Sequence, residues 1–540
     1  MKHRNLTFVL MAMLACSASA QNNNSRDDFF GKNSDGFAEA RKKMYEDFND
    51  FRKQCLKEYS DFVRKAWKDY KAEPAREAPE EKEVAPMMAP GADAQTASWF
   101  GKLFKKKKND KSQASQPKPA AKKPENRKSE VFEVKDVITP APTFEQPQPI
   151  AEVKEVSRSS NPYMTFSVFG TQCKVRIGED CRFTLRGLSS NTVADVIEKF
   201  FSKPQFDNLL YDCLQERKRH EFSDWAYYQM LIALTEKFYG AKTNEATLVK
   251  CFLYSQSGYK MRMAHDSNRL YMLAASHHFI FGKSYFYIDG ESFYLLEGEG
   301  SDRMVICEAK FPKESSLSLQ MSAAQILEDN PVRQRTITSL KNPNFSFTIT
   351  SNKNYMDFYE TYPSSSVNEN FMTRWAMYAN TPLEKGIREQ LYPPMRAKLQ
   401  GLSQLDAVQQ LLWWMHGTMY DPDNDITNCF LYRYDEESWG YDRAFFGEET
   451  LFYPYCDCED RSILLSHLVR ELLNLDVVLV YYPGHLAMAV GFTENVEGDC
   501  VMYNGRKFIV CDPTYLGCDV GETMPTMQGL KTTVILLERS

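Results

Sequence analysis

The order of elements between Cys458 and Asp512 constrains the fold more than any other feature of this sequence. The stretch CDCEDRSILLSHLVREL begins with two cysteines and continues with leucines at helical spacing, which predicts an amphipathic helix that starts near Cys458. The buried strand VVLVYYP follows, a Pro-Gly pair ends it, and HLAMAVGF forms the next strand with His485 in first position. An Asn-Gly turn then predicts a hairpin whose second strand ends at Asp512. Elements in this order can bring the three residues to one cleft.

These residue types in this order suit thiol catalysis. A free thiol is only slightly ionised at neutral pH, but a helix N-terminus and an imidazole partner lower the pKa of a thiol to roughly 3.5–7.5. Cys458 would have both. His485 would take the thiol proton and later deliver it to a leaving amine, while Asp512 would hold the imidazole in one tautomer and orientation.

The same motifs resemble those of the transglutaminase-like superfamily, a papain-related fold used by transglutaminases and by many bacterial cysteine peptidases and amidohydrolases. The resemblance rests on CDCEDRSILLSHLVREL, YYPGHLAMAV and KFIVCDPTY, and it extends from about Gly401 to Pro525. The three residues are evenly spaced, with 27 residues from Cys458 to His485 and 27 from His485 to Asp512. The resemblance implies that Cys458 is the nucleophile, His485 the base and Asp512 the orienting acid, with no cofactor.

A donor for the oxyanion hole is expected on the preceding helix. In this superfamily a polar side chain there often completes the hole, and AVQQLLWWMHGTMY offers His416 as the first candidate and Gln409 as the second. Loss of one such donor typically lowers the rate about 10²- to 10³-fold.

Two alternatives assign the cysteines other roles. Cys456, Cys458, His485 and Cys511 could hold zinc, although a Cys-x-Cys pair is not the usual ligand spacing and neighbours in a strand point to opposite faces. A disulfide between Cys456 and Cys458 would span about 6.6 Å, at the outer limit for such a bond. Cys456 is therefore also a candidate redox partner that reversibly masks Cys458. The order of the residues therefore favours the triad, and we expect no metal site.

The N-terminus predicts export. Residues 1–20 combine a basic head, an apolar run of about ten residues and a final Ala-Ser-Ala, which is typical of a cleaved signal peptide. The mature protein would be periplasmic or extracellular. Lipoprotein anchoring through Cys16 is an alternative. No later apolar run reaches the roughly 18 residues of a membrane span.

Composition predicts the organisation of the rest of the chain. Residues 21–72 carry apolar side chains at helical spacing from Phe37 to Tyr70, which predicts one long amphipathic helix that docks on the main body or on a partner protein. Residues 73–155 are rich in Pro, Ala, Lys and Glu, so a disordered linker is expected. A middle α+β domain (156–365) and the transglutaminase-like domain (366–540) follow.

The middle domain shows the same order of elements as the C-terminal one. NEATLVKCFLYSQ predicts a helix, two strands follow it, with RLYMLAA as the second, and SYFYIDGESFYLLEG predicts a hairpin. Asn244 stands where the cysteine would be, and Asn268 near the place of the histidine. We therefore expect a degenerate, non-catalytic copy of the same fold, with an unrelated α+β domain as the alternative.

These observations predict an exported α+β protein that performs acyl transfer on amide or peptide bonds of a protein or peptide substrate. The net charge of −6 argues against a general nucleic-acid partner. The alternative is a binding or scaffold protein that keeps the fold without turnover and recruits partners through its N-terminal helix.

Overall fold

A computed structural model of the chain describes residues 53–79, 84, 87–89, 128–139, 143–155, 161–321, 324–418, 443–453 and 456–538, and the backbone alone at 420–421 and 426–427. The chain divides into two compact units, and the second, Tyr59–Ser540, holds every labelled strand and helix named below. The predicted signal peptide, Cys16 and the first part of the predicted amphipathic helix lie outside the described residues. Helices and mostly antiparallel sheets together confirm the α+β class.

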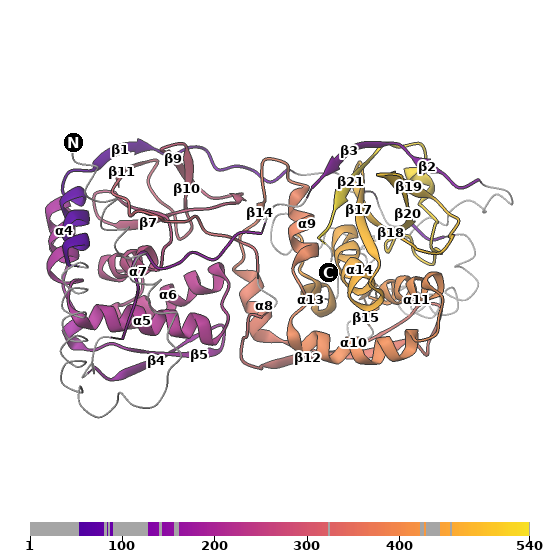
Figure 1. The fold of residues 1–540 in the computed structure, drawn as a ribbon, viewed down its shortest axis with the longest axis horizontal. Helices are drawn as coiled ribbons and strands as arrows, with labels where there is room; N and C mark the ends of the chain where they lie inside the picture. The colour runs from indigo at the N-terminus through magenta and orange to yellow at the C-terminus, as the bar shows by residue number, and fades with distance from the viewer. Residues whose placement is uncertain are drawn as a thin grey trace, which may run out of the picture. The chain divides into compact units, whose positions relative to one another are not determined.

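A seven-stranded sheet forms the core of the C-terminal part, in the order β2-β19-β20-β18-β17-β21-β3 (Figure 1). Its strands are β2 (Val131–Phe132), β3 (Val134–Ile138), β17 (Asp476–Tyr482), β18 (His485–Gly491), β19 (Cys500–Tyr503), β20 (Arg506–Cys511) and β21 (Thr532–Leu536). Helix α14 (Cys458–Leu473) packs against β17 and β18, whose side chains are buried almost throughout. The helix, strands and hairpin predicted for this segment are confirmed.

A tight turn sets the register that brings His485 and Asp512 together. Asn504 and Gly505 join β19 to β20 with φ of 48° and 75°, and two positive φ values are typical of the type I′ turn that suits a twisted hairpin. Strand β20 then pairs with β18, with Cys511 opposite Met488. Since alternate residues share a face of a strand, Asp512 follows on the face that His485 occupies.

A six-stranded sheet forms the core of the middle part, in the order β1-β11-β6-β7-β10-β9. Its strands are β1 (Trp67–Lys71), β6 (Met261–His265), β7 (Leu270–Ala275), β9 (Tyr285–Ile288), β10 (Glu291–Leu295) and β11 (Arg303–Cys307). Helix α7 (Asn244–Gln256) packs against β6 and β7 (Figure 1).

The two sheets share one pattern of connections. In each, a helix precedes a central antiparallel pair, β6-β7 or β17-β18. A hairpin then adds two strands beside the second member of the pair, β10 and β9 or β20 and β19. The last strand, β11 or β21, returns beside the first member.

The remaining elements surround these cores. The helices are α4 (Ser190–Lys199), α5 (Pro204–Arg219), α6 (Asp224–Tyr239), α8 (Lys353–Glu360), α9 (Thr373–Asn380), α10 (Lys385–Leu399), α11 (Gln404–Gly417), α13 (Gly447–Phe452) and the 3₁₀ turns η1 (Glu179–Cys181) and η3 (Pro525–Met527). The strands are β4 (Tyr163–Val168), β5 (Thr171–Arg176), β8 (Phe279–Ile280), β12 (Pro331–Thr338), β13 (Ser346–Asn352), β14 (Ser365–Ser366), β15 (Tyr420–Asp421) and β16 (Ile426–Thr427). Over the ranges that the structure describes, each helix is too short or too polar to span a bilayer.

The predicted amphipathic helix is wrong at its C-terminal end. Residues 53–63 are helical, but Trp67–Lys71 form β1, which pairs antiparallel with β11. The Trp67 ring packs on His265 with ring centroids 5.0 Å apart. Pairing at the edge of a sheet therefore overrides the helical spacing of the aromatic residues.

The prediction of a disordered linker over 73–155 is also wrong where the structure describes that segment. Strand β2 pairs in parallel with β19, and β3 pairs in parallel with β21, so this segment forms both edges of the seven-stranded sheet. Composition alone did not reveal these strands, because their hydrogen bonds and their buried faces come from the C-terminal sheet.

The packing of β2 on the sheet predicts that its buried side chain stabilises the folded protein. Phe132 is 3% exposed and its ring lies 5.2 Å from that of Tyr482. Phe132→Ala should lower the free energy of unfolding by about 3 kcal/mol, the cost of emptying a buried aromatic site. Val131→Ala is the matched control, because Val131 is 62% exposed. Urea denaturation of both variants tests this, and equal midpoints would show that the segment does not pack on the sheet.

Candidate active site

Helix α14 begins at Cys458 because the residues on either side of it supply a cap. Asp457 is the N-cap, and its carboxylate accepts the Asp460 N–H at 3.3 Å. The Asp460 carboxylate in turn accepts the Asp457 N–H at 3.2 Å, which completes a capping box. Cys458 is therefore the first helical residue, and it is 7% exposed.

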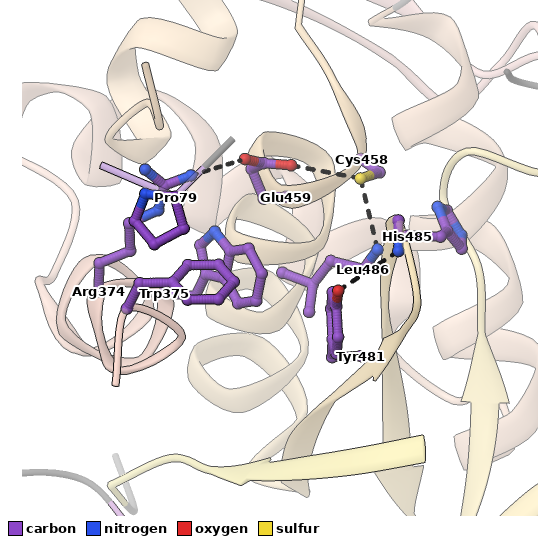
Figure 2. A pocket seen from close by; sticks show the side chains of 10 residues that line it. Pro79, Arg374, Trp375, Cys458, Glu459, Tyr481, His485 and Leu486 are labelled. Atoms are coloured by element: carbon purple, nitrogen blue, oxygen red, sulfur yellow. Dashed lines mark hydrogen bonds and ion pairs between the residues drawn. The ribbon is translucent and has the colours of Figure 1, made fainter. Parts of the chain in front are cut away.

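The Cys458 sulfur forms hydrogen bonds with the backbone of β18 and with a neighbouring carboxylate. Sγ accepts the Leu486 N–H at 3.4 Å and donates to Glu459 Oε2 at 3.3 Å. Glu459 also receives Nη2 of Arg374 at 3.5 Å, and both side chains of this ion pair are 4% exposed. Figure 2 shows the contacts as a line from Arg374 through Glu459 to the sulfur. The sulfur thus lies between the start of β18 and a buried carboxylate.

His485 and Asp512 form the second half of the site. His485 Nε2 lies 2.9 Å from Asp512 Oδ2, and both side chains are fully buried. The other carboxylate oxygen accepts the N–H groups of Thr514 at 3.0 Å and Tyr515 at 3.2 Å. His485 Nδ1 has no hydrogen-bond partner among the described residues. Asp512 therefore fixes the ring through one nitrogen, while the other nitrogen makes no hydrogen bond to Cys458 or to any other described residue.

Cys458 and His485 line the same cavity (Figure 2). Its other walls include the aromatic rings of Phe371, Trp375 and Tyr481. The cavity volume is about 20 Å³, which is room for a water molecule or two. The structure therefore brings the predicted nucleophile and base to one small cavity, with the predicted acid behind the base.

Described residues from the N-terminal part of the chain lie beside this site. Pro79 is part of the cavity wall, and the Val84 N–H donates to the carbonyl of Gly484 at 2.8 Å. The Ala89 N–H donates to the Leu516 carbonyl at 2.8 Å. Main-chain hydrogen bonds thus hold Val84 next to the residue before His485 and hold Ala89 next to the turn after Asp512.

The two predicted oxyanion donors have other partners. His416 Nδ1 accepts the Gly517 N–H at 3.3 Å, and burial lowers the pKa of His416 to about 3, so its ring is neutral. Gln409 Oε1 accepts the Val520 N–H at 2.8 Å. Neither side chain lines the cavity, and both bind the backbone that follows Asp512. Their assignment as oxyanion donors stays a prediction without support from these contacts.

Cys456 belongs to a small apolar cluster rather than to the cavity. It packs with Phe445 and Tyr453, and its sulfur lies 4.0 Å from Thr418 Oγ1. Every cysteine that the structure describes, Cys456 and Cys458 included, is a free thiol. The structure therefore contains no disulfide between these two cysteines, and a redox role for Cys456 stays a prediction.

The zinc alternative does not fit the described side chains. Among Cys456, Cys458, His485 and Cys511, no three ligand atoms lie within 4.8 Å of one another. The Cys511 sulfur instead contacts the carbonyl of Ile509 at 3.7 Å. This arrangement agrees with the expectation that neighbouring strand residues point to opposite faces.

Arg461 is a positioning residue that the sequence analysis missed. Its side chain is 0% exposed, Nη1 donates to Thr514 Oγ1 at 2.8 Å, and Nη2 donates to the carbonyl of Cys456. It therefore connects the residues before Cys458 to the turn that holds Asp512. An arginine three residues after the predicted nucleophile, on an otherwise apolar helix face, was the available signal.

His467 is a buried histidine on α14. The charged and polar residues near it in the sequence are typical of a solvated helix face, but His467 is 2% exposed and its Nε2 lies 3.4 Å from the carbonyl of Tyr378. Helices α9, α11 and α13 cover the side of α14 that faces away from the sheet. Burial, with the nearby Arg470 charge as a second cause, lowers the pKa of His467 to about 3.

Comparison with known proteins identifies no relative: no protein-family model, no curated protein and no solved structure matches the chain.

The buried His467 predicts a loss of stability in acid. Below its ordinary pKa of 6.5 the unfolded chain binds a proton at His467, whereas the folded chain does so only near pH 3. The unfolded state therefore binds more protons in this window, and the free energy of unfolding should fall by about 1.4 kcal/mol per pH unit from this group as pH falls from 6.5 towards 3. Denaturation between pH 6.5 and 4.5 should give a shallower slope for His467→Gln than for the parent. Parallel slopes would contradict this account.

Proposed function

We propose that the chain is a thiol-dependent acyl-transfer enzyme, similar in chemistry to the transglutaminase-like superfamily, that acts on amide or peptide bonds. The observation that carries the proposal is the 2.9 Å contact between His485 Nε2 and Asp512, with the opposite ring nitrogen unpartnered among the described residues and Cys458 in the same cavity. Nucleophile, base and orienting acid in this arrangement support acyl transfer.

The reaction passes two protons in turn through one ring, one in each half. His485 Nδ1 takes the thiol proton as the Cys458 sulfur attacks the carbonyl carbon of the substrate. The C–N bond then breaks, the imidazolium gives its proton to the leaving amine, and a thioester is left on Cys458. A water molecule that gives a proton to the same nitrogen attacks the thioester, which releases the acid and restores the thiol. Asp512 stabilises the imidazolium in both halves.

Stabilisation of the oxyanion is assigned to the backbone. N–H groups in the first turn of a helix have no acceptors within the helix, and Cys458 is the first residue of α14. Such groups point towards negative charge that develops beside the sulfur. This assignment needs no contribution from His416 or Gln409.

An extended polypeptide is the proposed class of substrate. The chain's own residues lie beside the site, with Pro79 in the cavity wall and the Val84 N–H bonded to the carbonyl of Gly484. A backbone that forms a main-chain hydrogen bond with the chain's own residues can form such bonds with an extended peptide. We prefer hydrolysis over crosslinking because of the resemblance to the superfamily. We prefer an exported location over a cytosolic one because of the N-terminal sequence.

We further propose that the middle part is a degenerate copy of the same fold. Asn244 is the first residue of α7, and its Oδ1 accepts the Leu270 N–H at 2.8 Å, just as the Cys458 sulfur accepts the Leu486 N–H. The residue before Leu270 is Arg269, so Arg269 rather than Asn268 takes the place of His485.

The same comparison places an acid in the copy. Leu273, three residues after Leu270, pairs with Leu295, and Ala489, three residues after Leu486, pairs with Val510. Glu297 lies two residues after Leu295, as Asp512 lies two residues after Val510, so Glu297 takes the place of Asp512. Asn244, Arg269 and Glu297 include neither a thiol nor an imidazole. The middle part therefore supports a binding role rather than a second centre of catalysis.

Two features favour a second candidate function, a non-catalytic scaffold. The Cys458 thiol donates to Glu459, and the cavity beside it is small, at about 20 Å³. Both features suit a site that is not in use. Reactivity of the thiol separates the two candidates.

Selective alkylation tests the enzyme. At neutral pH, iodoacetamide should modify Cys458 faster than any other cysteine, and peptide mapping by mass spectrometry identifies the labelled residue. His485→Ala should slow this labelling at least about tenfold, because the thiol loses its base. Cys500→Ser is the matched control, since Cys500 is a buried cysteine on β19 outside the cavity. Equal labelling of all cysteines, or no labelling at all, would contradict the proposed enzyme and support the non-catalytic scaffold.

Glu459 provides a second test. A carboxylate 3.3 Å from the sulfur opposes formation of a second negative charge there. Glu459→Gln should therefore speed the alkylation of Cys458 severalfold at pH 7, with the difference shrinking as the pH rises and the thiol ionises in both proteins. Stopped alkylation time courses from pH 6 to 9 measure the effect. A slower reaction in the variant would show instead that Glu459 assists removal of the thiol proton.

A further inference from the structure

A second cluster of reactive side chains lies in the middle part of the chain. Cys173 on β5, Glu216 on α5 and His220 just after α5 place their Sγ, carboxylate oxygen and ring nitrogen within 4.8 Å of one another. They are 0%, 5% and 8% exposed. Glu216 and His220 are four residues apart at the end of a helix, so their side chains project from the same face.

The histidine is directed into this cluster without a hydrogen bond. His220 Nε2 is buried and has no hydrogen-bond partner among the described residues. Its near neighbour is Glu216 Oε2 at 3.6 Å, which is too long for a hydrogen bond. The ring is held in place by stacking on Phe222, with centroids 5.0 Å apart and planes at 17°. A buried, unpartnered nitrogen that faces a carboxylate and a thiol is a ready ligand.

We propose that Cys173, Glu216 and His220 bind a zinc ion. Thiolate, imidazole and carboxylate are the donors that zinc takes, whereas calcium and magnesium take oxygen only. Nitrogen and oxygen ligands at about 2.0–2.2 Å from a tetrahedral zinc lie about 3.3–3.6 Å apart, which matches the separation of the His220 and Glu216 atoms. The cation would sit at the C-terminal end of α5, where the helix dipole favours positive charge. Water would fill the fourth position.

Binding includes one proton release and no redox change. The Cys173 thiol loses its proton to solvent as the Zn–S bond forms, and Glu216 and neutral His220 bind without further proton transfer. Two negative ligands then balance the charge of the ion. The site is separate from the Cys458 cavity, and the proposal does not depend on the proposed activity.

Arg219 would tune the affinity. Its Nη2 donates to the same Glu216 Oε2 and also, at 2.7 Å, to the carbonyl of Gln172. The Arg219 side chain is 49% exposed, so it can turn away from the carboxylate into solvent. The guanidinium therefore competes with zinc for one oxygen.

Zinc titration of the full chain tests the proposal. After treatment with a chelator, the purified protein should bind one zinc ion at this site, measured by competition with a chromophoric chelator, and zinc should raise its melting temperature. Cys173→Ser and His220→Ala should each weaken binding by at least about 10- to 100-fold, as loss of a ligand costs no less than loss of a supporting residue. Cys213→Ser is the matched control, because Cys213 is a buried cysteine on the same helix outside the cluster.

A surface variant keeps the test informative if the buried variants unfold. Arg219→Ala should bind zinc about two- to fivefold more tightly than the parent, since it removes a part-exposed competing ion pair. Substitution with cobalt should give a thiolate-to-metal absorption band that Cys173→Ser lacks. Absence of binding by the parent, unchanged affinity in Cys173→Ser and His220→Ala, or weaker binding in Arg219→Ala would overturn the proposal.

Discussion

The contact between the first turn of α14 and the first residues of β18 supports the rest of the candidate site. Leu486 donates its N–H to the Cys458 sulfur and accepts the Ser462 hydroxyl at 3.0 Å through its carbonyl. These two bonds hold the helix N-terminus at the start of the strand. Because His485 immediately precedes Leu486, the same contact places the imidazole beside the thiol's cavity.

Buried polar groups make this arrangement specific. Asp512 is fully buried and uses both carboxylate oxygens, one on His485 and one on the turn that follows it. Arg461, also fully buried, joins that turn to the carbonyl of Cys456. Loss of the contacts of Asp512 or of Arg461 would leave a buried charge unpaired, which lowers stability. These contacts therefore favour one conformation of the loops around the sulfur.

Under the proposed function, the middle part keeps the fold of the C-terminal part without its catalytic residues. Its sheet has the same connections as the C-terminal sheet, and an Asn244 oxygen accepts the main-chain N–H that a sulfur accepts in the other half. The hydrogen bond between the first helical residue and the strand needs only an acceptor atom on the side chain, so asparagine can replace cysteine there. Under the proposed function, one half acts on the substrate and the other half contributes binding surface.

Local sequence determined the helix and strands that carry the candidate site, and tertiary structure decided their surroundings and the strands at the sheet edges. Periodicity, capping residues and the Asn-Gly turn predicted α14 and β17 to β20, and with them the partnership of His485 and Asp512, because helix starts and tight turns depend on neighbouring residues. The strands of 131–138, the burial of His467 and the Glu459–Arg374 pair were not predictable in this way. Each of them depends on residues that lie tens to hundreds of positions away in the sequence. Contacts of this kind produce no local sequence pattern from which they could be predicted.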